Sequence, residues 1–141
     1  MMINNFEDKI FAIVLLPLMA LMAPFLVFLI ELFLPYPYIV EEIIKAVLVF
    51  QLIDLKNKKY QLTITVFMGI LFSLTETVFY FFNFFMLTSL APLLERLVLT
   101  TLLHILTIVT ILLPTWINKK LLPLGVIAAM IIHYIYNLFF L

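Results

Sequence analysis

The chain lacks cysteine and has little glycine and little charge. None of its 141 residues is cysteine, which excludes disulfide bridges, a thiolate nucleophile and a cysteine-ligated metal. Two glycines stand against fifteen phenylalanines, so a glycine-rich phosphate loop and helix packing through a GxxxG motif are also excluded. Lysine and arginine together number eight and equal the acidic residues, which leaves no basic excess to bind a nucleic acid.

Apolar residues dominate what is present. They make up 67% of the chain and charged residues only 11%, whereas an ordinary soluble domain has about half and about a quarter. Apolar stretches of about 20 residues without two-residue alternation favour membrane-spanning helices over barrel strands. The sequence therefore predicts an all-α integral membrane protein with a single transmembrane domain, residues 1–141. We expect a compact bundle of about five helices, with spans at about 10–34, 38–55, 60–87, 92–116 and 121–141.

Lysines gather at alternate connections between these spans. With five spans, one face of the membrane receives Lys9, Lys56, Lys58, Lys59, Lys119 and Lys120. Because cytoplasmic loops carry an excess of basic residues, we expect the N-terminus in the cytoplasm and the C-terminus outside, in the plasma membrane. The first apolar run is too long for the core of a signal peptide, so we expect it to be retained as a span.

Ionisable side chains occur within the predicted spans, although each costs about 2.5–3.5 kcal/mol there by insertion scales. Depth can be counted at about 1.5 Å per residue. On this count seven polar residues from four predicted helices fall in the outer half of the membrane: Glu41, Glu42, Lys45, Glu76, His104, His133 and Asn137. Pairs spaced three or four residues apart share one helix face. A common layer indicates one polar cavity inside the bundle, open toward the outer face.

A cavity of this composition suits hydrolysis. A buried carboxylate can take a proton from water, and the activated water can attack an amide carbonyl while histidine and asparagine side chains stabilise the oxyanion. Adjacent helical residues point about 100° apart, so one of Glu41 and Glu42 faces the substrate while the other pairs with Lys45. Three alternatives remain: zinc held by glutamate and histidine without an HExxH motif, a polar network that only joins helices, and a small proton or ion carrier.

Four motifs follow one another on successive predicted spans. They are EExxK at 41–45, FxxxE at 72–76, a spaced Arg96 and His104, and HxxxN at 133–137. In this order the chain resembles the PrsW-type branch of the glutamic intramembrane proteases, which are related to the CAAX-processing and bacteriocin-immunity proteases. The resemblance covers about residues 38–141. Most members of that branch have more spans and longer loops.

The resemblance implies an endopeptidase that cuts a membrane-anchored protein or peptide. It implies that Glu41 is the general base that activates water, with Glu42 and Lys45 positioning it. Glu76 occupies the place where the CAAX-type relatives carry a histidine.

The resemblance also assigns roles on the last two helices. His104 and His133 would bind water or polarise the carbonyl, and Asn137 would support the oxyanion. No cofactor is expected, with zinc as the lesser alternative. A non-catalytic immunity or assembly protein of the same fold remains the main competing interpretation.

Overall fold

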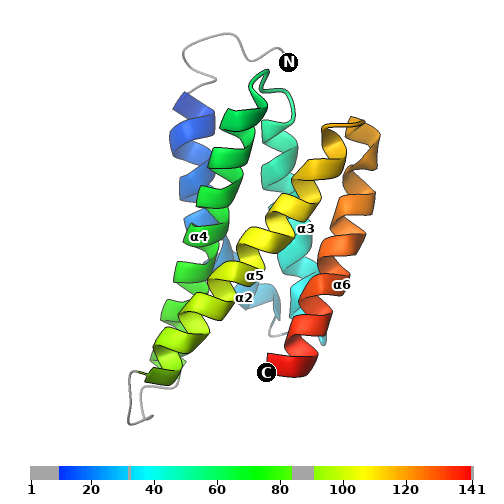
Figure 1. The fold of residues 1–141 in the computed structure, drawn as a ribbon. Helices are drawn as coiled ribbons and strands as arrows, with labels where there is room; N and C mark the ends of the chain where they lie inside the picture. The colour runs from blue at the N-terminus through cyan, green and yellow to red at the C-terminus, as the bar shows by residue number, and fades with distance from the viewer. Residues whose placement is uncertain (1–9, 32, 84–90, 141) are drawn as a thin grey trace.

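The computed structural model describes residues 10–31, 33–83 and 91–140. Within these ranges the chain is helical and contains no strand, which confirms the predicted all-α class. The elements, shown in Figure 1, are η1 (Phe11–Leu15), α2 (Leu16–Glu31), α3 (Pro37–Leu52), α4 (Lys58–Asn83), α5 (Ala91–Thr115), η2 (Lys119–Leu121) and α6 (Leu122–Phe140). They pack as one compact bundle.

Four segments of the described chain are long and apolar enough to cross a membrane: Phe11–Ile30, Lys58–Phe79, Leu94–Thr115 and Lys119–Phe139. The remaining helix, α3, has 16 residues and carries Glu41, Glu42 and Lys45, so it falls short in both length and composition. It nevertheless packs against α2, α5 and α6. Its end at Leu52 comes earlier than the predicted 38–55, and residues 84–87 of the predicted third span lie outside the described ranges.

The early end of α3 has a polar cause. Gln61 on α4 donates hydrogen bonds from its side-chain amide to the backbone oxygens of Ile53 (3.2 Å) and Leu55 (2.7 Å). These hydrogen bonds hold the chain in a turn after Leu52, so α3 does not continue. The Gln61 amide oxygen accepts a hydrogen bond from Trp116 Nε1 at 2.6 Å. The α3–α4 connection is thereby fixed to the end of α5.

Lysines mark one end of the bundle, here called the basic end. It carries Lys56, Lys58, Lys59, Lys119 and Lys120, all exposed. Lys58 Nζ lies 3.5 Å from the backbone oxygen of Trp116, and Lys119 donates a hydrogen bond to Asp54. That hydrogen bond lowers the pKa of the Asp54 carboxyl below its ordinary value. The predicted clustering of lysines on one face therefore holds for these five, while Lys9 lies outside the described residues.

The interior changes character along the bundle. Toward the basic end it is an apolar core in which Leu52, Met68, Ile108, Ile111 and Leu112 are fully buried. Toward the opposite end the buried side chains include polar and charged ones, which are described with the site below. The apolar half supplies the hydrophobic burial that stabilises the fold. The polar half packs on that core.

Both glycines of the chain lie where α5 meets a neighbouring helix. A Cβ at Gly69 of α4 would stand 3.0 Å from Ile105 Cα and 3.2 Å from the carbonyl carbon of His104. A Cβ at Gly125 of α6 would stand 2.9 Å from Ile111 Cα. These atoms belong to the α5 backbone and cannot rotate away. The absence of a side chain therefore lets α4 and α6 approach the α5 backbone closely.

Candidate active site

A buried ion pair lies at the centre of the polar half. Lys45 Nζ donates to Glu42 Oε1 at 2.6 Å, and both side chains are completely buried. The same ammonium group donates to Thr107 Oγ1 on α5 at 3.2 Å and lies 4.9 Å from the centre of the Phe72 ring. Glu42 and Lys45 are three residues apart on α3, a spacing that puts them on one face. Three helices thus fix the position of the ammonium group.

His133 on α6 completes this part of the site. Its Nδ1 lies 2.7 Å from Glu42 Oε1 and 3.8 Å from Glu41 Oε2. The histidine is buried, and the Tyr38 ring packs beside it with 6.0 Å between ring centres. Because Oε1 of Glu42 is shared by Lys45 and His133, the Glu42 carboxylate is held from both sides.

A second carboxylate–histidine pair joins α4 to α5. His104 Nε2 is hydrogen-bonded to Glu76 Oε2, and Arg96 Nη2 lies 3.7 Å from Glu76 Oε1. His104 is completely buried, whereas the Glu76 side chain is 30% exposed. The ring centre of His104 is 5.8 Å from that of His133. The two glutamate–histidine pairs are therefore neighbours.

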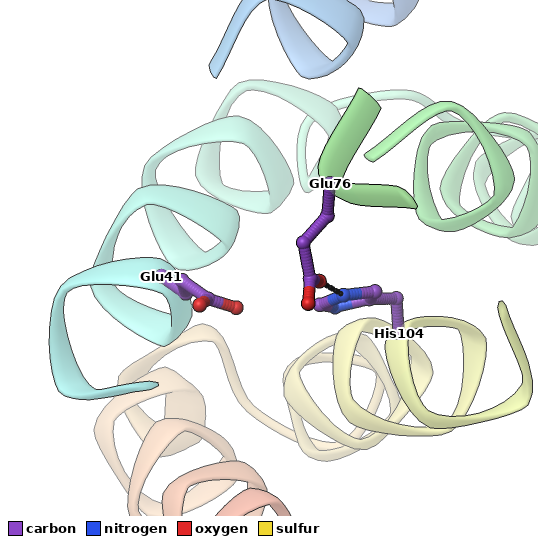
Figure 2. A group of neighbouring side chains, drawn as sticks. All are labelled: Glu41, Glu76 and His104. Carbon is purple, nitrogen blue, oxygen red and sulfur yellow. Dashed lines mark hydrogen bonds and ion pairs between the residues drawn. The ribbon is translucent and has the colours of Figure 1, made fainter. Parts of the chain in front are cut away.

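Glu41 lies at the junction of the two pairs. Figure 2 shows its carboxylate pointing from α3 toward the Glu76–His104 pair on α4 and α5. One potential ligand atom from each of these three residues lies within 4.8 Å of the other two. The same holds for Glu41 with Glu42 and His133.

A small crevice reaches this junction. It has a volume of about 50 Å³ and is lined by Pro24, Val27, Phe28, Glu41, Phe72, Glu76 and Phe79. A cavity of roughly 10–15 Å³ on this measure suffices for one water molecule. The crevice is therefore large enough for a water molecule beside the two carboxylates that line it.

Charge within the cluster is nearly but not fully balanced. Three carboxyl groups, those of Glu41, Glu42 and Glu76, are accompanied by two basic side chains, Lys45 and Arg96. In a low-dielectric interior an uncompensated charge is costly.

Six of the seven predicted site residues lie together in this cluster: Glu41, Glu42, Lys45, Glu76, His104 and His133. Asn137 is partly buried one helical turn beyond His133, and among the described residues no hydrogen bond joins its side chain to the cluster. Thr107 was not predicted. Its position three residues after His104 could have indicated it, because that spacing places both on one face of α5.

Two groups offer three ligands each to a metal ion. In each group the potential ligand atoms lie within 4.8 Å of one another. In the group of Glu41, Glu42 and His133, the Lys45 ammonium already occupies Glu42 Oε1 and would repel a cation. The group of Glu41, Glu76 and His104 is therefore the better zinc candidate.

Comparisons of this chain with protein families, with curated proteins and with solved structures found no match. The resemblance to PrsW-type proteases therefore remains a prediction.

Proposed function

We propose that the protein is an intramembrane endopeptidase that cuts a membrane-anchored protein or peptide. We further propose that it resides in the plasma membrane, with its basic end in the cytoplasm, as the distribution of lysines favours. The cluster then lies in the outer half of the membrane.

One observation carries the proposal: Glu41 adjoins two glutamate–histidine pairs beside a crevice large enough for water. Here carboxylates from α3 and α4 line a crevice, next to a buried histidine on α5. This arrangement suits an acid–base reaction that consumes water.

The proposed reaction begins with a water molecule in the crevice. Glu41 takes one proton as the water oxygen bonds to the carbonyl carbon of the substrate, and the carbonyl oxygen becomes an oxyanion. A histidine of the cluster, His104 or His133, donates a hydrogen bond to that oxyanion. The carbon–nitrogen bond then breaks, and the proton on Glu41 passes to the leaving amine.

Glu42 and Lys45 act as positioning residues in this scheme. Their mutual hydrogen bond, together with contacts to Thr107 and His133, fixes the direction of α3 at Glu41. Such positioning matters because displacing a reacting group by about 1 Å can reduce a rate about 100-fold.

The test uses purified protein in lipid vesicles with a panel of synthetic single-span peptides, each carrying a fluorophore and a quencher. We expect Glu41→Gln to reduce cleavage at least about 100-fold, which is the usual contribution of a general base. Glu95→Gln is the matched control, because Glu95 lies on α5 but is exposed. It should cleave at the wild-type rate.

Two results would contradict the proposal. One is equal cleavage by wild type and Glu41→Gln. The other is failure of folded wild-type protein to cleave any peptide of the panel. In the second case, proton flux into the same vesicles that is lost in Glu41→Gln would instead support a proton carrier.

A further inference from the structure

An apolar groove runs along the outer surface of the bundle between α3 and α6. Its volume is about 420 Å³, and its walls consist only of apolar residues: Ile43, Ala46, Val47 and Phe50 from α3, and Leu122, Pro123, Val126, Ile127 and Met130 from α6. On each helix these positions recur every three or four residues and so form one face. The groove contains none of the residues of the candidate active site.

The groove exists because α3 and α6 are close at only one end. They meet through the Glu42–His133 hydrogen bond and through the rings of Tyr38 and Tyr134, whose centres are 5.8 Å apart. Toward the basic end the two helices splay apart in Figure 1. The small side chain of Ala46 leaves the space between them unfilled.

The length of the groove corresponds to one leaflet of a bilayer. Residues 43–50 and 122–130 span eight and nine positions, or about 12–14 Å of helix. The hydrocarbon core of a bilayer is about 30 Å thick, so the groove covers less than half of it before the Glu42–His133 contact closes it. A spanning helix of a partner protein would need the whole thickness, whereas one acyl chain needs only its own leaflet.

Positive charge lies at the open end. The short helix η2 leads directly into α6, so Lys119 and Lys120 immediately precede the groove residues Leu122 and Pro123. Lys119 is paired with Asp54, and Lys120 is exposed. The N-terminus of α6 adds the positive end of its helix dipole at the same place. An anionic headgroup is therefore favoured at this position, as in other basic pockets between membrane helices.

We propose that this groove is a binding site for one anionic glycerophospholipid. An acyl chain lies between α3 and α6, and the phosphate lies beside Lys120 at the N-terminus of α6. This site is independent of the proposed protease activity.

The test is lipid binding to delipidated protein in detergent, measured by native mass spectrometry. The two probes are dioleoyl phosphatidylglycerol and dioleoyl phosphatidylcholine, which have the same chains but different headgroup charge. We expect one phosphatidylglycerol per chain, bound about fivefold more tightly than phosphatidylcholine, because one lysine near an anionic surface contributes about 1 kcal/mol.

Two pairs of variants locate the site. Val47→Trp fills the groove and should abolish this binding, whereas Val98→Trp should not, although Val47 and Val98 are similarly exposed at 53% and 58%. Should Val47→Trp fail to fold, Ile127→Trp fills the groove from the α6 wall. Lys120→Gln should remove the preference for phosphatidylglycerol, and Lys59→Gln, at the same end but on α4, should preserve it.

Several outcomes would overturn the proposal. Equal affinity for the two lipids would contradict the headgroup contact. An equal effect of Lys59→Gln and Lys120→Gln would indicate general attraction of the lipid to the basic end. Unchanged binding in Val47→Trp and in Ile127→Trp would place the lipid elsewhere. A two-chain mass that disappears in Val47→Trp would show that a second copy of the protein covers the groove.

Discussion

Removing the buried cation at the centre of the site should destabilise the protein strongly. In Lys45→Met, Glu42 loses its 2.6 Å partner while remaining completely buried, with only His133 beside it. Deleting one member of a buried ion pair typically costs about 3–5 kcal/mol, because the other charge is left uncompensated. Adding Glu42→Gln removes that charge and keeps an acceptor for His133. The double variant should therefore recover most of the loss.

Unfolding by dodecyl sulfate in mixed micelles provides the measurement, with Trp116, the single tryptophan of the chain, as the fluorescent reporter. Lys59→Met serves as control, because Lys59 is exposed and its replacement should change stability by less than about 0.5 kcal/mol. If Lys45→Met loses under about 1 kcal/mol, or if the double variant is no more stable than the single one, the reasoning about this buried pair is wrong.

Three further predictions concern the remainder of the bundle. Gly69→Ala and Gly125→Ala should each lower stability by about 1–3 kcal/mol through overpacking against the α5 backbone, despite alanine's better helix propensity; unfolding in mixed micelles measures this. Gln61→Leu should shift the emission of Trp116 and cost about 1–3 kcal/mol, because the carbonyl groups of Ile53 and Leu55 lose their donor; fluorescence spectra and unfolding test both effects. The Asp54–Lys119 pair should stabilise the protein by less than about 1 kcal/mol, since it is exposed. Because the pKa of Asp54 is lowered in the fold, this contribution is complete above the unfolded value of about 3.9 and is lost as the pH falls through the folded value. Stability of wild type and Asp54→Asn should therefore differ at neutral pH and converge in strong acid.

Helix periodicity was sufficient to predict most of the cluster. Charged side chains at matching depths on separate apolar helices are expected to meet in the interior of the bundle, because exposing a charge to lipid costs too much free energy. Sequence spacing also indicated that one of Glu41 and Glu42 pairs with Lys45. It did not identify which one, since spacings of three and four residues are both compatible with contact. The structure assigns this pairing to Glu42, which His133 holds from the other side.

Contacts between distant segments account for what the sequence did not predict. Thr107 donates its hydroxyl to its own helix, as Thr100 and Thr110 do, and its hydrogen bond from Lys45 depends on the approach of α3. The early end of α3 depends on Gln61, which follows in the next helix. Asn137 shares a face with His133, but four residues of helix carry it about 6 Å farther along the axis. Sequence spacing predicts the helix face on which a residue lies, whereas the depth of that residue in the bundle depends on how the helices cross.

The two glycine contacts determine which of the helices around the cluster can move. Because α4 and α6 rest on the α5 backbone at Gly69 and Gly125, widening either seam would break close packing along a helix. Glu76 and His104 consequently belong to one rigid unit together with His133. Glu41 and Glu42 instead belong to α3. This helix meets α6 largely through side chains near the cluster and diverges from it toward the basic end. Of the helices that carry the cluster, α3 is thus the one whose displacement would separate these two carboxylates from the histidines while leaving the three-helix unit intact.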